Sequence, residues 1–394
     1  MKIAQRMNRI KPSSTMAISA KTNEMIANGI SVIDLGLGQP EFPTPDVAAN
    51  AGIRAITEGY TQYTPTAGAN DLKDAIIEKM KNDHQLIYDR KEVIVSCGAK
   101  HTLYNIAQVL FEAGDEVIIP APYWVTYPDQ VLLNDATPVI VKTREEDRFL
   151  ITPDQLKAAI TPRTKAIIFN SPSNPTGSVY TKKHYEAIAD LLAAASLYVI
   201  SDEIYEKFIY DGETYTSIAS LSSDLKEKTL VVNGVSKSYS MTGWRIGYAA
   251  GPKAVIEAMS TLQSQTTSNP TSISQKAALA ALKEGALFVS NMVSEYSLRR
   301  DLMVAGLNAI DGISCPTPAG SFYVFPNVTG LFGKKPGLNS SAKIAEYFLN
   351  DFAVSTVPGE PFGMEGYLRL SYAASKEVLF EGIKRIKNAV LNLG

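Results

Sequence analysis

The sequence predicts an α/β protein with a mostly parallel central sheet, helices on both faces of that sheet, and a smaller α+β domain after it. Segments of strand and helix character alternate from about residue 46 to residue 284, which is the pattern of parallel sheets connected by helices. Several strand segments are continuous apolar runs, as expected of a sheet buried on both faces. At 394 residues, the chain is long enough for two or three domains, or for one large domain with a satellite.

The expected elements follow one another in a regular order. A short helix at 16–28 and an extended segment at 32–37 precede a turn-rich stretch that ends at Pro45. Strands are then expected at 92–96, 116–120, 138–142, 165–170, 197–201, 229–233 and 245–250, and helices at 70–82, 102–112, 153–160 and 182–195. A long helix at 286–310 leads to strands at 321–325 and 367–372 and to helices at 342–352 and 376–391.

These elements predict three parts of the chain. Residues 1–45 would form an N-terminal arm and part of the small domain. Residues 46–285 would form the large, ligand-binding domain, and residues 286–394 an interdomain helix and the small C-terminal domain.

Composition narrows the class of protein. The hydrophobic share of 45% and the charged share of 20% are ordinary for a globular protein. The formal net charge is −2 and no long basic run occurs, which argues against nucleic acid or an anionic membrane as a partner. The polar start of the chain does not resemble a signal peptide, and no apolar stretch reaches eighteen residues.

Cysteine and histidine usage argues against metal and disulfide frameworks. Cys97 and Cys315 are the only cysteines and lie far apart in the sequence, so neither a disulfide framework nor a cysteine-based zinc site is expected. The three histidines show no metal-ligand spacing, and we predict no metal. A reducing cytoplasm is the expected compartment.

The segment 236–247, which reads SKSYSMTGWRIG, is the most informative stretch. It follows an apolar strand, and small and hydroxyl residues surround Lys237, with Arg245 eight positions later. Such a lysine can hold an aldehyde cofactor as a Schiff base while a guanidinium binds its phosphate. A Ser-Lys pair before an arginine is also common in surface loops, so this segment alone favours the surface-loop interpretation.

Two further segments favour a binding site instead. The apolar run 166–169 leads into the sequence NSPSNPTG at 170–177, and the strand 197–201 ends at Asp202, three residues before Tyr205. Ligands of open α/β sheets bind at the carboxyl ends of the strands. Three strands therefore bring Asn174, Asp202 with Tyr205, and Lys237 to one edge.

These three segments together resemble the fold-type-I enzymes that use pyridoxal 5′-phosphate (PLP), specifically the class I aminotransferases. Their order, spacing and flanking strands agree, and the resemblance runs from about residue 11 to the C-terminal helix. The bacterial-type aspartate aminotransferases, some of which also accept prephenate, are the most similar subgroup. The resemblance implies the PLP-dependent transferase fold type I.

It also implies roles around the cofactor ring. Lys237 would hold PLP and move a proton between the substrate Cα and the cofactor C4′. Asp202 would keep the pyridine nitrogen protonated, although an acid after a strand also commonly caps the next helix. Asn174 and Tyr205 would reach the ring oxygen O3′, the alternatives being a turn asparagine and a packing ring. Trp124 would stack on the ring, unless it is a core tryptophan.

The phosphate end is implied in the same way. Backbone amides of Gly98 and Ala99, at the start of a helix, would point at the anion, and Arg245 would add a bidentate fork. The Ser236 hydroxyl is a further candidate. Some relatives carry a phosphate-binding serine three positions before the lysine, where this chain has Gly234.

The substrate side is implied by residues on other segments. Arg369 would clamp the substrate α-carboxylate, with a structural ion pair as the alternative, and the backbone of Gly38 would approach the bound substrate, next to Trp124 and Asn174. Lys100 matches the lysine that binds a distal carboxylate in the bacterial-type subgroup. Thr15, with Ser14, matches the N-terminal residues that assist this lysine in the subgroup. Lys11 matches a position that is associated with the use of prephenate there.

The resemblance therefore predicts an aspartate aminotransferase that exchanges the amino group between L-aspartate and 2-oxoglutarate, with prephenate left open as a further acceptor. Amino acids and 2-oxo acids would be its partners, and Tyr63 would reach the neighbouring subunit's phosphate in a homodimer. A β-lyase, a cyclopropane-carboxylate synthase or an aromatic aminotransferase of the same fold is the alternative. A PLP-binding regulatory module is more remote, because no DNA-binding extension is visible.

Overall fold

The computed structural model describes residues 2–10, 12 and 14–393. Its largest sheet has seven strands in the order β2-β8-β7-β6-β5-β3-β4. They are β2 (Val93–Ser96), β3 (Glu116–Ala121), β4 (Thr137–Lys142), β5 (Thr164–Asn170), β6 (Tyr198–Asp202), β7 (Thr229–Gly234) and β8 (Gly247–Ala250). Every strand of this sheet begins and ends within two residues of its predicted range.

One strand of the large sheet runs against the others. Pairs β3/β4, β3/β5, β5/β6 and β6/β7 are parallel, whereas β8 is antiparallel to both β2 and β7. The prediction of a mostly parallel sheet is confirmed. Because β8 is reversed, its first residues meet the same edge as the last residues of its neighbours, with Gly247 opposite Ser96 and Gly234.

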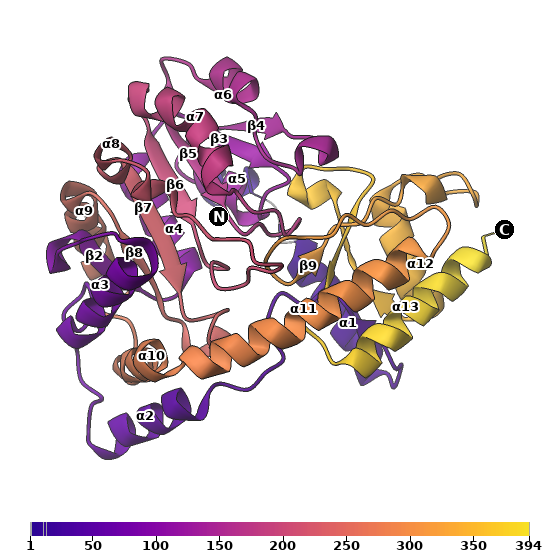
Figure 1. The fold of residues 1–394 in the computed structure, drawn as a ribbon, viewed down its shortest axis with the longest axis horizontal. Coiled ribbons are helices and arrows are strands. Elements are labelled where there is room, and N and C mark those ends of the chain that lie inside the picture. The colour runs from indigo at the N-terminus through magenta and orange to yellow at the C-terminus, as the bar shows by residue number, and fades with distance from the viewer. Residues whose placement is uncertain (1, 11, 13, 394) are drawn as a thin grey trace.

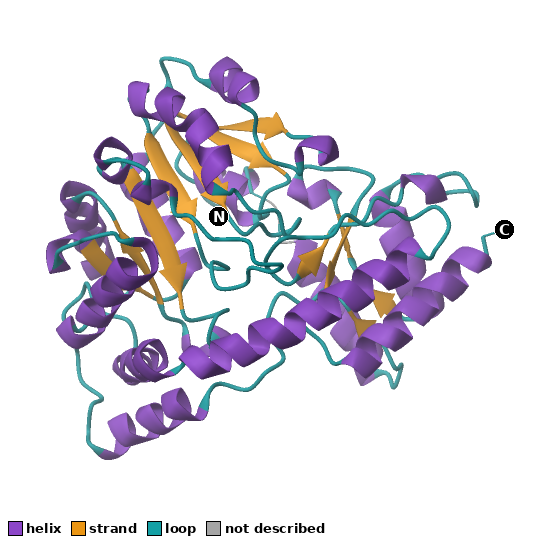
Figure 2. Cartoon of the chain, viewed as in Figure 1, coloured by secondary structure: helices purple, strands orange, loops and turns teal. Residues whose placement is uncertain are grey.

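Helices cover both faces of this sheet (Figure 1 and Figure 2). They are α3 (Asn70–His84), α4 (Ala99–Leu110), α5 (Thr126–Leu132), α6 (Pro153–Ala159), α7 (Lys182–Ala194), α8 (Ser223–Lys226), α9 (Lys253–Ser264) and α10 (Ser272–Glu284). Helix α2 (Asp46–Thr57) packs on α10, farther from the sheet (Figure 1). Ile94 packs in one core with residues of α4, α5 and α9. Its neighbours Val93 and Val95 point to the opposite face and pack with α3 and α10, and farther along the sheet Ile118 and Ile167 pack with α6, α7 and α8.

The C-terminal part is a smaller α+β unit, as predicted. It contains a three-stranded antiparallel sheet of β9 (Tyr323–Val324), β11 (Val357–Pro358) and β12 (Leu368–Ser371), with α12 (Ser341–Phe352) and α13 (Lys376–Leu391). The long helix α11 (Ala286–Asn308) leads to it from the large sheet (Figure 1). From the N-terminal segment, β1 (Ile33–Asp34) pairs with β10 (Val354–Ser355), which supports assigning part of the arm to the small domain. The domain boundaries stay a prediction.

Several elements were not singled out from the sequence. Helices α2, α5, α8, α9 and α10 are additional, and α4 begins at Ala99 rather than at residue 102. Helix α10 is rich in alanine and serine and is buried over much of its surface, so it lacks the polar stripe that marks an amphipathic helix. Helix α1 (Ser14–Ala27) and the short 3-10 helices complete the described elements: η1 (Gln5–Asn8), η2 (Arg90–Glu92), η3 (Glu145–Asp147), η4 (Ile218–Ser220), η5 (Thr242–Trp244), η6 (Thr329–Leu331) and η7 (Glu360–Phe362).

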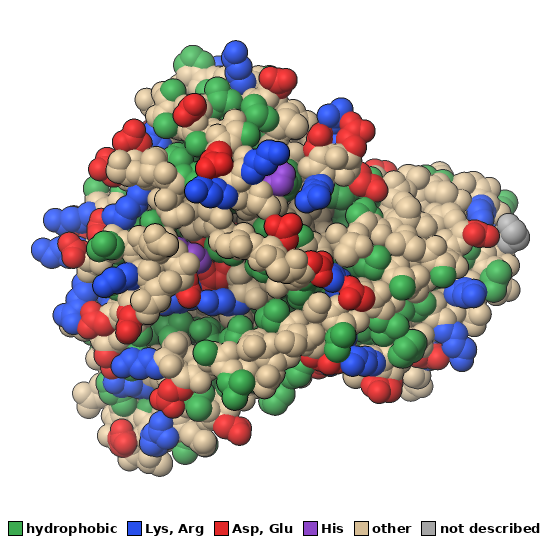
Figure 3. Space-filling view, viewed as in Figure 1, with side chains coloured by type: hydrophobic (Ala, Val, Ile, Leu, Met, Phe, Trp, Pro, Cys, Tyr) green, Lys and Arg blue, Asp and Glu red, His purple; other side chains and the backbone are tan. Residues whose placement is uncertain are grey.

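The surface carries charges of both signs. On the face seen in Figure 3, lysine and arginine side chains are interspersed with acidic ones, without a broad patch of one sign. Among the described residues, none of the helices combines the length and apolar character that a membrane span requires.

Candidate active site

A cavity of about 400 Å³ opens at the strand edge where the motifs were predicted to meet. Most of the predicted site residues line it: Gly38, Ala99, Lys100, Trp124, Asn174, Asp202, Tyr205, Ser236, Lys237, Arg245 and Arg369. They come from segments separated by more than three hundred positions in the sequence. The convergence predicted from strand ends is therefore present in the fold.

Lys237 follows β7 and extends into this cavity. Its Nζ donates a hydrogen bond to the carbonyl oxygen of Gly38, at 2.6 Å. Burial is the main reason that the pKa of Lys237 falls to about 8, and the nearby guanidinium groups of Arg245 and Arg369 add to the effect. About a tenth of this amine is therefore unprotonated at pH 7, far more than for an ordinary lysine, and the unprotonated amine is the form that attacks a carbonyl.

Asp202 ends β6 and is 3% exposed. Its Oδ2 accepts a hydrogen bond from the Tyr127 hydroxyl at 2.6 Å, and its Oδ1 accepts one from the Ile204 amide at 3.3 Å. Burial raises the pKa of Asp202 to about 6, against the lowering effect of these hydrogen bonds. The residues that follow form a turn rather than a helix, so the structure rules out the helix-cap alternative.

Arg369 lies on β12 and is 3% exposed. One guanidinium nitrogen donates to Asn174 Oδ1 at 3.1 Å and another to the Gly36 carbonyl at 2.6 Å, while Nε has no partner. Within the described part of the chain, no carboxylate forms an ion pair with it, which weighs against the structural ion pair considered from the sequence. A buried guanidinium bonded only to neutral oxygens retains its capacity for a carboxylate.

The start of α4 and Arg245 lie at the end of the cavity that was predicted to bind the phosphate. Gly98 precedes the helix with φ +93°, and a Cβ there would lie 2.2 Å from Arg245 Nη2. Only glycine therefore lets the guanidinium lie across the helix N-terminus, where amides point outward. At Gly234 a Cβ would lie 2.8 Å from the Ile246 carbonyl oxygen, so a serine at this position would require the neighbouring backbone to shift. Ser236 is 6% exposed and lines the cavity.

Trp124 and Lys100 lie together on the outer side of the cavity. The Lys100 ammonium is 4.8 Å from the centre of the Trp124 ring, and the indole packs edge to face on Tyr127 at 5.4 Å. Burial, and then the charge of Arg245, lowers the pKa of Lys100. The lysine is thus held over an aromatic face without a carboxylate partner among the described residues.

Tyr205 lies in the turn after β6 and is 4% exposed. Its hydroxyl is 3.1 Å from the hydroxyl of Tyr323 on β9. Tyr323 also lines the cavity, and the Arg369 guanidinium lies over its ring at 4.6 Å. Tyr205 was considered from the sequence, whereas Tyr323 was not.

Sequence reasoning missed other residues of the cavity lining. Tyr127, the hydrogen-bond donor to Asp202, lies three positions after Trp124 on the unpredicted helix α5. Recognising a helix there would have placed both aromatic side chains on one face. Further lining residues that were not predicted are Ser19, Gly36, Leu37, Gln39, Asn170, Ile204, Thr242 and Tyr323.

Four predicted residues, Gly98, Tyr63, Lys11 and Thr15, are not among those that line the cavity. Gly98 lies directly before α4, next to Arg245. Tyr63 is 90% exposed. Lys11 lies outside the described residues, and for Thr15 the structure describes the helical backbone of α1 but not the side chain. Their proposed roles stay predictions, as do the chemical roles of the residues inside the cavity.

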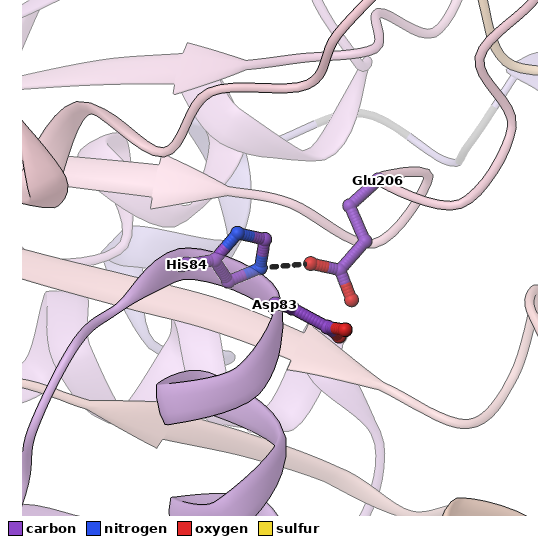
Figure 4. A group of neighbouring side chains, drawn as sticks. All are labelled: Asp83, His84 and Glu206. Carbon is purple, nitrogen blue, oxygen red and sulfur yellow. Dashed lines mark hydrogen bonds and ion pairs between the residues drawn. The ribbon is translucent and has the colours of Figure 1, made fainter.

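A second polar cluster joins the C-terminal end of α3 to Glu206, the residue that follows Tyr205. Asp83, His84 and Glu206 each place one potential ligand atom within 4.8 Å of the others (Figure 4). The spacing of the histidines could not reveal this group, because Glu206 is distant in sequence from His84. Lys79 pairs with Glu206 and, at 2.9 Å, with Asp83, and Lys207 lies 2.8 Å from Asp83. We call these five residues the His84 cluster; its carboxylates are already balanced by two ammonium groups.

Comparison with known proteins places the chain in a family. The model of the family described as "Aminotransferase class I and II" matches residues 30–386. The aspartate aminotransferase of Geobacillus stearothermophilus is 48% identical over 386 residues, 98% of each chain. The aspartate/prephenate aminotransferase of Cereibacter sphaeroides is 46% identical over 390 residues, also 98% of each chain.

Solved structures agree. The crystal structure of the aspartate aminotransferase from Rhizobium meliloti has a TM-score of 0.96 at 41% identity and covers 99% of each chain. The Thermus thermophilus aspartate aminotransferase with maleate has a TM-score of 0.93 at 40% identity, over 99% of this chain and all of the other. The predicted fold type I is confirmed. The chain belongs to the class I and II aminotransferase family and is an enzyme, a transaminase.

Proposed function

We propose that this enzyme binds PLP and transfers the amino group reversibly between L-aspartate and 2-oxoglutarate, giving oxaloacetate and L-glutamate. The main support is one observation: a nucleophilic amine, a buried carboxylate and a buried guanidinium face the same cavity, and none is paired with an opposite charge among the described residues. Lys237, Asp202 and Arg369 are these groups. Burying charges without partners is costly, so a ligand with complementary charges is expected there.

The polar groups of the cavity fit PLP. The start of α4, with Arg245 and Ser236, would hold the phosphate. Asp202 would face the pyridine nitrogen, and its raised pKa is the response of a buried carboxyl that lacks a cationic partner. Trp124 would cover the ring, with Asn174 and Tyr205 near its oxygen. When bound, PLP supplies an electron sink for the charge that develops at the substrate Cα.

The chain's own residues would divide the work. Lys237 would attach the cofactor and, once displaced by substrate, move the proton at the substrate Cα, a task suited to an amine with a pKa of about 8. Tyr127 would keep the Asp202 carboxylate oriented through its 2.6 Å hydrogen bond. Arg369 would hold the α-carboxylate and fix the substrate in one orientation.

A second cation near the cavity supports a dicarboxylic substrate. Lys100 lines the cavity and carries no described carboxylate, so it is free to bind a distal carboxylate. The relatives are named for aspartate or for aspartate and prephenate, and one solved relative was obtained with maleate, a dicarboxylate. Prephenate is a further acceptor to be tested beside 2-oxoglutarate, and amino acids and 2-oxo acids would be the partners of the site.

The half-reaction tests this function. Adding L-aspartate to the PLP-loaded enzyme should convert its visible absorbance to that of pyridoxamine phosphate and release oxaloacetate, and 2-oxoglutarate or prephenate should reverse the change. The Lys100→Ala variant should lose about 10- to 100-fold in kcat/KM for L-aspartate, the value of one charge-assisted hydrogen bond, and much less for L-phenylalanine. A loaded enzyme that does not respond to L-aspartate would refute the proposal.

We also propose a homodimer with sites near the subunit interface. Tyr63 is 90% exposed and therefore accessible to a second subunit, and the resemblance places it against the partner's phosphate. Calibrated gel filtration should give a dimer, and a fully active monomer would contradict this. A cytoplasmic location remains a prediction that rests on the sparse use of cysteine.

A further inference from the structure

We propose that Tyr323 is a positioning residue: its hydroxyl donates a hydrogen bond to the Tyr205 oxygen and so directs the Tyr205 proton toward the ring oxygen O3′ of the cofactor. The inference rests on the proposed function, because it concerns how this chain prepares its site for PLP. It adds a residue from the C-terminal sheet to a group otherwise built on the large sheet.

The two tyrosines approach each other from different parts of the fold. Tyr205 follows β6, whereas Tyr323 lies on β9. Their hydroxyl oxygens are 3.1 Å apart, and their rings meet edge to face at 5.8 Å. Tyr323 is fully buried. Its hydroxyl is also confined by Gly38, where a Cβ would lie 3.2 Å from the Tyr323 oxygen.

The hydrogen bond between Tyr205 and Tyr323 leaves one hydroxyl proton free for a third group. Each phenol has one proton to donate and can also accept. Among the described residues, the only hydrogen-bond partner of either hydroxyl is the other tyrosine. The bond between them uses one proton, so the accepting tyrosine keeps its own proton for a third group. If Tyr205 accepts, its proton is available to the cofactor.

The charge of Arg369 favours this direction. Its guanidinium lies over the ring of Tyr323 at 4.6 Å. A cation over a phenol ring draws electron density from it, which makes the Tyr323 hydroxyl the better donor of the two. A donor chain of this kind also strengthens the next hydrogen bond along it. Tyr323 therefore connects the substrate clamp with the partner of O3′.

A spectroscopic titration tests the role. A donor aimed at O3′ favours the less protonated form of the bound cofactor, in which that oxygen carries more negative charge. In PLP-loaded Tyr323→Phe, which keeps the ring under Arg369, the midpoint of the pH titration of visible absorbance should rise by about 0.5–1 pH unit, as loss of one neutral hydrogen bond implies. An unchanged midpoint would overturn the inference.

A double-mutant cycle shows whether Tyr323 acts through Tyr205. The Tyr205→Phe variant should raise the midpoint further, and Tyr205→Phe/Tyr323→Phe should match Tyr205→Phe alone, because the second hydroxyl then has nothing to position. Additive shifts would contradict the proposed chain. The matched control is Tyr372→Phe, which removes a buried hydroxyl that donates to the Ser321 carbonyl at 3.1 Å and should leave the midpoint unchanged.

A fluorinated tyrosine and the absorbance of the wild type complete the test. Replacing Tyr323 by 3-fluorotyrosine preserves the side chain and makes the phenol a stronger donor, so the midpoint should fall; this readout remains if Tyr323→Phe does not fold. Failure of the proposed function is distinguishable, since a wild-type protein that shows no cofactor absorbance after incubation with PLP and removal of the free cofactor would refute PLP binding itself. A wild-type protein that titrates, with the same midpoint in Tyr323→Phe, would refute only the role of Tyr323.

Discussion

Two neighbouring groups of buried ionisable residues differ in whether their charges form ion pairs. In the cavity, Asp202, Lys237 and Arg369 form no ion pair with one another or with other described residues, and their hydrogen bonds go to neutral groups. In the His84 cluster, beside Tyr205 in the sequence, Glu206 is paired with Lys79 and His84. The contrast distinguishes charged groups without an ion-pair partner, which we propose bind a ligand, from charged groups that pair with each other within the fold.

The pKa directions express the same difference. Burial raises the pKa of Asp202 to about 6 because nothing sufficiently compensates it. Burial would also raise the pKa of Glu206, but Lys79 and His84 outweigh it, and the pKa of Glu206 falls. The two carboxylates are four positions apart and both buried. Partners, rather than depth, therefore decide their charge state.

The largest expected effect is on activity at Lys237. The Lys237→Ala variant should transfer amino groups at least about 10³-fold more slowly, because it removes both the attachment point and the base. Single-turnover absorbance changes with L-aspartate measure this. Lys237→Arg is the control that keeps the charge and should be equally impaired. Retention of a tenth of the wild-type rate in either variant would show that another group serves as the base.

The next effect is on stability in the His84 cluster. Glu206→Gln should lower the free energy of unfolding by about 3–5 kcal/mol, because it removes the buried carboxylate that pairs with both Lys79 and His84 and leaves Asp83 as the remaining charge partner of Lys79. Urea unfolding of the cofactor-free protein at pH 7.5 measures the loss. A change below about 1 kcal/mol would mean that Asp83, at 2.9 Å from the same ammonium, suffices to balance it.

The same chemical change at Asp202 should have the opposite sign. An acid whose pKa rises to about 6 in the fold binds its proton more tightly there than in the unfolded chain, so its contribution to stability is lost as pH rises from about 4 to about 6. Asp202→Asn should therefore make the cofactor-free protein more stable at pH 8 by up to about 3 kcal/mol. The gain should vanish near pH 4.

Urea unfolding of the wild type and of Asp202→Asn at pH 4.5 and pH 8 measures this change in stability. Loss of stability at pH 8 in Asp202→Asn would mean that the Tyr127 hydrogen bond contributes more than the burial costs. The variant should at the same time lose most of its transaminase activity, because an amide cannot keep the pyridine nitrogen protonated. Gain of stability with loss of activity is the signature of a functional group.

The sequence predicts those parts of the fold and of the cavity whose pattern lies within one short segment of the chain. The strands of the large sheet were predicted to within two residues, because apolar runs bounded by turn residues are local. Lys237, Asp202 and Asn174 follow from those strands, since parallel strands end at one edge. Tyr127 depends on a seven-residue helix with a proline inside it, and Tyr323 depends on how the C-terminal sheet packs against the large one.

The His84 cluster illustrates the same boundary. Three of its five residues, Lys79, Asp83 and His84, lie on one helix. Lys79 and Asp83 are four positions apart, which is a recognisable helical pair. Glu206 and Lys207 join them only through the tertiary fold. The local pattern therefore predicts one ion pair of the five-residue cluster. It does not predict that the pair is buried, and burial distinguishes a structural ion pair from a surface one.

The smallest expected effect is the pH dependence of His84. Burial alone would lower the pKa of His84, but its hydrogen bond with Glu206 and the charge of that carboxylate raise the pKa above 6.5. A histidine with a raised pKa stabilises the fold fully below about pH 6.5, and this stabilisation is lost as pH rises through its folded pKa. The difference in unfolding free energy between the wild type and His84→Gln should thus be on the order of 1 kcal/mol at pH 6 and shrink by pH 9.

The matched control is His184→Gln. Burial lowers the pKa of His184, so the stability difference between the wild type and this variant should change with pH in the opposite direction. A His84 difference that is constant from pH 6 to pH 9 would show that the ring acts through packing against Tyr215, at 5.4 Å, and not through its charge.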